Sequence, residues 1–270
     1  MMDLEALDAA LAGTAFCRAA GGRVLHFEEI SSTNTYLVEQ AQQDAAAGTV
    51  CVADRQTAGR GRGGHAWHSE AGAGLYVSAL LRPELSVSHA LKISLAAGLA
   101  VQTTLEQSCG FHVDLRWPND IVVPQPGAFS KKMGGLLTET GVSVEGQLRY
   151  AVIGIGLNLN HIEMPAEIAA SATSARMITG RSVRREEVLV SLLHALSQEM
   201  ILLVQDPEEI LRRFTSKSGW ALGKRVKVDE DEGYTGVTDG LDERGFLRVR
   251  LANGAIRTPR HGGVREVGPE

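Results

Sequence analysis

The chain has 270 residues, of which 44% are hydrophobic and 22% charged, and its formal net charge at pH 7 is −5. This composition is typical of a globular protein with a buried core, and an acidic chain lacks the broad basic face with which proteins coat nucleic acid. Its three cysteines lack the spacing of a disulfide framework or a zinc motif, and no run reaches the roughly 18 apolar residues of a membrane span, so we expect a cytoplasmic protein.

The first half of the chain switches between helical and strand patterns. The Ser, Thr and Asn residues of SSTN are typical of a helix start, and Gly48 is typical of a helix end. The first expected elements are a helix over 4–20, a strand over 23–30 and a helix over 33–47. Strands over 49–56 and 73–83 and a long helix over 88–108 follow.

The second half begins with strands and continues with helices. The expected elements are a strand pair over 111–123 around the turn WPND, strands over 133–140 and 146–160, and helices over 165–218 with a break at Pro207. Because strands and helices do not alternate one for one, we predict an α+β fold: a mixed or antiparallel sheet with helices on one side.

The texture changes after residue 222. Short β-type runs are separated there by the turn sequences EDEG, DERG and ANG. This pattern is typical of a small all-β barrel of about 50 residues. We therefore expect two domains, a larger one over 1–219 and a barrel over 220–270.

The segment ADRQTAGRGRGG, residues 53–64, holds four glycines and three arginines. Glycines let backbone N–H groups approach an anion closely, and Arg60 and Arg62 have the fork geometry that suits phosphate or carboxylate oxygens. We interpret the segment as a local anion site, with a solvated surface loop as the alternative.

Three further segments carry candidate chemistry. In RWPND, Asp120 is a candidate magnesium ligand that Arg116 keeps ionised, or part of a structural ion pair. In SKKMGGLL, Lys131 and Lys132 point to opposite faces if extended, so only one faces a site; both are solvated in the alternative view. Asn158 lies inside an apolar strand and needs a hydrogen-bond partner, which a nucleotide would supply.

Two patterns are set aside. GIGLN lacks the third glycine and the prompt helix of a dinucleotide-binding motif. In HAWHSE, His65 and His68 lack convincing further zinc ligands, so we interpret them as ordinary loop residues and Trp67 as an aromatic wall.

Six motifs in one order resemble those of the biotin–protein ligases, also called biotin–[acetyl-CoA-carboxylase] ligases: SSTN, RQTAGRGRGGHAW, GLYVSALLRP, LRWPND, KKMGGLL and GIGLN. The resemblance covers residues 24–160 strongly and the tail more loosely. It implies a mixed sheet like that of the class II aminoacyl-tRNA synthetases, followed by an SH3-like barrel. It also implies an enzyme that makes biotinyl-5′-AMP from biotin and ATP with Mg²⁺, and then biotinylates a lysine of the biotin carboxyl carrier protein.

The resemblance also implies roles for residues on the biotin side. Ser32, Thr33 and Asn34 match the segment that holds the ureido ring of biotin, and Gln56 matches a further biotin contact.

On the phosphate side, the resemblance implies that Arg60, Gly61 and Arg62 close over the biotin carboxylate and the phosphates. Lys132, rather than Lys131, aligns with the essential lysine, and Asp120 has the acidic position of the turn. The remaining matches, which line the adenylate pocket, are Trp67, Gly135 and Asn158.

Other functions stay open from the sequence. A lipoate–protein ligase or octanoyltransferase of related fold is the nearest alternative, and a biotin-sensing regulator or nucleic-acid-binding module comes from a different class. Because SSTN begins about 30 residues into the chain, we expect no winged-helix DNA-binding domain and no operator binding. A homodimer is possible.

Overall fold

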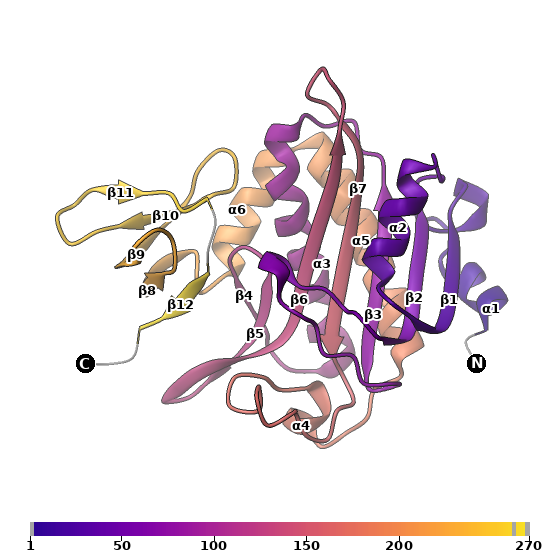
Figure 1. Ribbon diagram of the computed structural model, residues 1–270, viewed down its shortest axis with the longest axis horizontal. Coiled ribbons are helices and arrows are strands. Elements are labelled where there is room, and N and C mark those ends of the chain that lie inside the picture. Colours follow the sequence, from indigo (N-terminus) through magenta and orange to yellow (C-terminus); the bar gives the residue numbers. More distant parts are fainter. Residues whose placement is uncertain (1–2, 261–262, 268–270) are drawn as a thin grey trace.

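A computed structural model describes residues 3–260 and 263–267 of the chain. Its centre is a seven-stranded sheet in the order β1-β2-β3-β7-β6-β5-β4 (Figure 1). Strands β1 and β2 are parallel and every other neighbouring pair is antiparallel, so the sheet is mixed, as predicted. The strands are β1 Arg23–Ile30, β2 Thr49–Gln56, β3 Gly74–Leu81, β4 Asp114–Arg116, β5 Asp120–Gln125, β6 Ala128–Val142 and β7 Leu148–Asn158.

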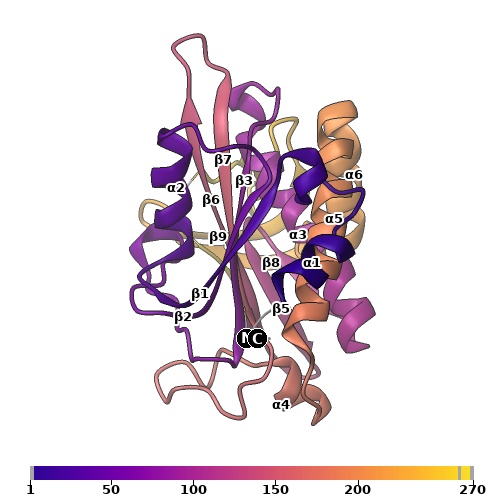
Figure 2. The same ribbon diagram turned by 90° about the vertical axis from the view of Figure 1, so that its right-hand side faces the viewer.

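Helices cover both faces of this sheet, so the prediction of helices on one side is wrong. Figure 2 shows α2 on one face and α1, α3, α5 and α6 on the other. The helices are α1 Leu4–Ala10, α2 Thr33–Gln42, α3 Ala90–Cys109, α4 Ala175–Thr179, α5 Arg185–Gln205 and α6 Pro207–Lys217.

The alternation of strand side chains explains the two layers of helices. Val50 and Val52 of β2 belong to the larger hydrophobic cluster, which includes the buried faces of α3 and α5. Cys51, between them, points to the other face and packs in a smaller cluster with Leu37 and Ala41 of α2. Since successive strand residues face opposite sides, the fully apolar run TVCV requires cover on both.

Two helices are shorter than expected. The pattern over 4–20 gives α1 and a separate 3-10 turn, Arg18–Ala20, because the chain turns at Gly13 with a φ of 82°. Helix α2 ends at Gln42 instead of residue 47, since Asp44 has a φ of 57° and starts the turn before Gly48. Helix α6 begins at Pro207, where the break was expected.

Helix α5 is the one helix of the described residues whose length and composition would allow it to cross a membrane. Its side chains Leu189, Leu192 and Leu196 are fully buried in the larger cluster, beside Leu95 and Leu99 of α3. This is the environment of a core helix, whose length and apolar composition can equal those of a membrane-spanning helix.

A second, antiparallel sheet follows the helices, in the order β11-β10-β9-β8-β12. Its buried side chains, among them Val226 and Leu247, continue the larger cluster. The Trp117 indole N–H also donates to the Gly245 carbonyl at 2.9 Å, which ties the WPND turn to this sheet. The strands are β8 Leu222–Val228, β9 Tyr234–Leu241, β10 Leu247–Arg250, β11 Ile256–Arg257 and β12 Val264–Glu266.

Candidate functional site

A cavity open to solvent lies between α2, the loop after β2 and the middle of β3, β6 and β7. Motifs that are far apart in the sequence meet in its wall. The lining includes these predicted site residues: Ser32, Thr33, Asn34, Gln56, Arg60, Gly61, Arg62, Trp67, Lys132 and Gly135.

One end of the cavity is a network of neutral polar groups. The Thr33 N–H and hydroxyl donate to Gln56 Oε1 at 2.9 and 3.1 Å. The Ser78 hydroxyl lies 2.8 Å from both Thr33 Oγ1 and Asn34 Oδ1. The Ser32 hydroxyl accepts a hydrogen bond from the Thr35 N–H at 3.3 Å and so begins α2 as its N-cap. These donors and acceptors are therefore oriented before a ligand arrives.

Glycines make the floor of the cavity. A Cβ on Gly154 would lie 2.4 Å from Asn34 Oδ1, and one on Gly156 would lie 2.5 Å from Trp67 Cε2. The Trp67 ring and the Asn34 amide thus lie directly on the backbone of β7. This role was not predicted from the sequence, although the glycines of GIG alternate and so share one face of a strand.

The opposite end of the cavity is cationic and is organised by Asp120. Lys132 Nζ lies 2.5 Å from Asp120 Oδ1, and Arg116 Nη2 lies 2.5 Å from Oδ2. Burial raises the pKa of the Asp120 carboxyl. The neighbouring cations Lys132 and Arg116 lower it by more than burial raises it, so the pKa is below its usual value. Lys132 Nζ also lies 5.4 Å from the centre of the Trp67 ring, a cation–π arrangement.

The two adjacent lysines point apart, as their strand positions predict. Lys132 lines the cavity. Lys131 instead places its Nζ 3.4 Å from the carbonyl oxygen of Ala169, in the segment between β7 and α4.

The two arginines of the loop differ in their partners. Arg60 pairs with Glu139 of β6 at 3.0 Å, and Glu139 also accepts from the Asn34 amide at 2.8 Å. Glu139 was not predicted from the sequence. Arg62 lies against a second cavity as well as the first, and burial lowers the pKa of its guanidinium while Asp120 opposes this change.

The second cavity lies between α3, the WPND turn and the C-terminal sheet. Arg62, Asn119, Leu136 and Leu137 line both cavities. The C-terminal sheet contributes two further arginines and an aromatic ring, and these are Arg244, Arg260 and Phe246. This cavity was not predicted from the sequence, because its wall depends on how the two sheets pack.

Asn158 lines neither cavity, and its expected nucleotide contact stays a prediction. Its side chain is buried, and its amide N–H donates to the Thr173 carbonyl at 3.1 Å. The partner that a buried Asn requires is therefore a backbone group of the segment before α4.

Asp120 does not fit the expected role of magnesium ligand. Mg²⁺ binds through carboxylate oxygens that are free to coordinate it, but each Asp120 oxygen already accepts a short hydrogen bond from a cation. Glu139 is likewise held by Arg60 and Asn34. The geometry gives Asp120 a different role, which is to position Lys132 and Arg116.

Two family models match the chain. The model of the biotin/lipoate A/B protein ligase family matches residues 26–158, and the model of the biotin protein ligase C-terminal domain matches residues 221–263. The two matches coincide with the seven-stranded and five-stranded sheets.

Curated relatives and solved structures give the same result. The bifunctional ligase/repressor BirA of Bacillus subtilis is 36% identical over 237 residues, covering 87% of this chain and 71% of the relative. The biotin–[acetyl-CoA-carboxylase] ligase of Mycobacterium tuberculosis is 29% identical, covering 81% of this chain and 80% of the relative. The biotin protein ligase of Aquifex aeolicus in complex with biotin and ATP superposes with a TM-score of 0.75 at 33% identity, covering 89% of this chain and 97% of that one.

Proposed function

The chain belongs to the biotin/lipoate A/B protein ligase family, and we propose that it is an ATP-dependent biotin–protein ligase. It joins biotin to AMP with release of pyrophosphate, and then transfers biotin to a lysine of the biotin carboxyl carrier protein of acetyl-CoA carboxylase. The observation that carries this proposal is that one cavity collects the polar, glycine and cationic residues of six separated motifs.

The first cavity suits biotin. The ureido ring of biotin is a compact group of donors and acceptors, which matches the fixed network of Thr33, Asn34 and Gln56. The apolar bicycle would lie beside the Trp67 ring, which itself packs on the glycine backbone of β7. This order points the carboxylate of biotin toward Lys132 and the arginine loop.

The second cavity suits the nucleotide. Arg244 and Arg260 supply positive charge for a triphosphate at its C-terminal side. The two cavities share the Arg62 and Asn119 walls, so a biotin carboxylate and an α-phosphate would meet there.

In the first step a carboxylate oxygen attacks the α-phosphorus and the bond to the bridging oxygen of pyrophosphate breaks. Two anions must approach to bonding distance, and Lys132 and Arg62 offset this repulsion and the charge that develops on the transferred phosphoryl group. Charge placed in advance is usually the largest catalytic contribution. Asp120 and Arg116 hold Lys132 in position for it.

In the second step the neutral amine of the acceptor lysine attacks the carbonyl carbon of biotinyl-AMP and AMP leaves. The arginine loop, held to β6 by the Arg60–Glu139 pair, covers the mixed anhydride. Exclusion of water from such an intermediate protects it from hydrolysis.

Two wider assignments belong to the proposal. We divide the chain into a catalytic part over 1–219 and a C-terminal part over 220–270, supported by the model matches. We also place the enzyme in the cytoplasm, where carboxylases of this kind would meet it, supported by its likeness to bacterial ligases.

The test is a labelling experiment with the purified chain, ATP and an acceptor domain. Radiolabelled biotin, lipoate and octanoate are supplied in parallel, and labelled acceptor is counted. We expect label from biotin alone, with equimolar pyrophosphate. Label from lipoate or octanoate alone would replace this proposal with the alternative acyl specificity of the family.

A further inference from the structure

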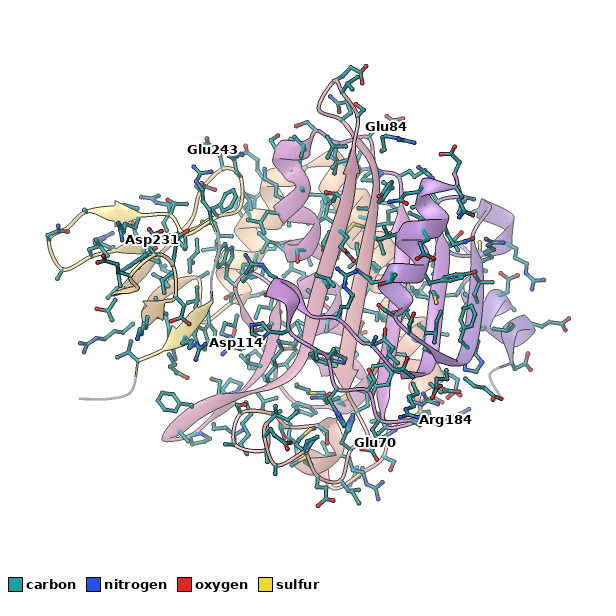
Figure 3. The ribbon with its side chains drawn as sticks, viewed as in Figure 1. Glu70, Glu84, Asp114, Arg184, Asp231 and Glu243 are labelled. Carbon is teal, nitrogen blue, oxygen red and sulfur yellow. The ribbon has the colours of Figure 1, made fainter. Side chains whose placement is uncertain are left out.

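Three potential metal ligands meet outside both cavities. His68 and Glu70 come from the segment that follows Trp67, and His161 comes from the segment just after β7. One ligand atom from each of the three lies within 4.8 Å of the other two. Figure 3 shows Glu70 beyond the lower end of the central strands, close to the segment that leads to α4.

His161 is the unusual member of this cluster. Its side chain is only 1% exposed, and neither of its ring nitrogens has a hydrogen-bond partner in the described part of the chain. A buried polar group without a partner is costly, so a site with an unpartnered imidazole indicates a missing ligand.

The backbone holds the cluster from both sides. The Ser174 hydroxyl donates to the His161 carbonyl at 2.6 Å. The Glu70 carbonyl accepts from the Tyr76 hydroxyl at 3.0 Å and from the Ala73 N–H at 3.2 Å. The rings of His68 and His161 lie near each other, with centroids 6.0 Å apart and an interplanar angle of 49°.

The ligand set selects the chemistry of the ion. Two imidazoles and one carboxylate suit Zn²⁺ and related transition metals, whereas Mg²⁺ and Ca²⁺ take oxygen ligands. Zinc lies about 2.0–2.2 Å from such ligands, so the three atoms must draw closer together. His68 and Glu70 are exposed and free to turn toward the buried ring.

We propose that His68, Glu70 and His161 bind a divalent transition metal of the Zn²⁺ type, with a fourth position open to water. The ion would join the end of β7 to the loop between β2 and β3. Two residues of this loop act at the first cavity. Trp67 forms its wall, and the Ser69 hydroxyl accepts from the Gln56 amide at 3.2 Å. The metal therefore stiffens the biotin side of the cavity, an effect that rests on the proposed function.

The first experiment measures the metal alone. Tag-free protein is treated with chelator and titrated with Co²⁺, whose visible spectrum reports tetrahedral coordination, and Zn²⁺ is followed by calorimetry. We expect one site per chain, weakened about 10-fold or more in His68→Ala and Glu70→Gln, which change exposed side chains, and in His161→Ala. His65→Ala, an exposed histidine of the same loop, serves as the matched control and should bind as the parent does.

Absence of Co²⁺ and Zn²⁺ binding in the parent chain, or equal binding by the parent and His68→Ala, would overturn the site. A second experiment measures biotin affinity with and without Zn²⁺. We expect Zn²⁺ to tighten biotin binding in the parent and not in His68→Ala; an unchanged affinity in the parent overturns the stiffening effect. A chain that binds Zn²⁺ but not biotin would contradict the proposed function and leave the metal site standing.

Discussion

At the scale of single residues, the site depends on how charges are paired. Asp120 holds Lys132 with one oxygen and Arg116 with the other, so it places two cations without adding free negative charge to the cavity. Glu139 does the same for Arg60. A cavity that must accept two anionic substrates thus keeps its carboxylates occupied.

Lys132→Ala is expected to slow adenylation by about 10²-fold or more, because it removes a cation aimed at the developing charge. Lys131→Ala is the matched control: it removes an equal charge one residue away, from a side chain that reaches Ala169 instead of the cavity. Pyrophosphate release in single-turnover reactions separates the two. Equal rates in the two variants would remove Lys132 from its role.

At the scale of elements, motif-bearing segments were more predictable than their neighbours. The strands over 49–56 and 74–81 were identified because continuous apolar runs are typical of buried strands. The roles of Ser78 and Glu139, by contrast, were not predicted, although the strands that carry them were. Only the register of the sheet, which pairs Ser78 with Gly154, places them at the cavity, and single-sequence patterns contain no information on register.

Helix ends were less predictable for a similar reason. Ser32 was recognised as the start of α2 because its hydroxyl caps the helix. The end of α2 depends on Asp44, which adopts a conformation that is uncommon for a residue other than glycine. Asp is one of the residue types enriched in this conformation, but the sequence pattern does not show which residue of the segment adopts it.

Gly156→Ala is expected to raise the KM for biotin at least about 10-fold, because a Cβ there would lie 2.5 Å from the Trp67 ring and push it into the cavity. Gly98→Ala in α3 is the control, since its Cβ would find only ordinary contacts from 3.7 Å outward. Steady-state kinetics with varied biotin measures the difference. An unchanged KM in Gly156→Ala would show that Trp67 does not limit the biotin cavity.

At the scale of the whole molecule, the two sheets act together. The larger hydrophobic cluster runs without a break from the central sheet into β8 and β10. Asp114, labelled in Figure 3 at the junction, accepts from the Gly219 N–H at 2.9 Å and so fixes the start of the C-terminal sheet. The position of Arg244 and Arg260 over the second cavity depends on this junction.

Asp114→Asn is expected to stabilise the protein at pH 7. Burial raises the pKa of the Asp114 carboxyl above its unfolded value, against the opposing hydrogen bonds from Gly219 and Leu115. The folded state therefore holds this proton to a higher pH, and the free energy of unfolding falls as pH rises from about 4 through the folded pKa. Asn keeps the accepting oxygen and does not titrate.

Urea unfolding of both proteins at pH 4 and pH 7 measures this effect. The variant should gain relative to the parent as the pH rises, and the gain should shrink at pH 4. A variant that is equally destabilised at both values would contradict the buried-charge explanation and assign the carboxylate a purely structural role.

Arg260→Ala is expected to raise the KM for ATP about 10-fold, equivalent to about 1.4 kcal/mol, and to leave biotin binding unchanged. The reason is that Arg260 lines the second cavity and not the first. Arg265→Ala, which removes an exposed arginine paired with Asp229 away from both cavities, is the control. An effect on biotin affinity as large as that on ATP would contradict the division between the cavities.

Strand β6 connects the two cavities. Leu136 and Leu137 lie in the walls of both, so a shift of the strand around one substrate also changes the wall around the other. Such linkage is reciprocal: the factor by which bound biotin alters the affinity for ATP equals the factor by which bound ATP alters the affinity for biotin. A shift of β6 on binding of either substrate would therefore couple the two affinities within a single chain.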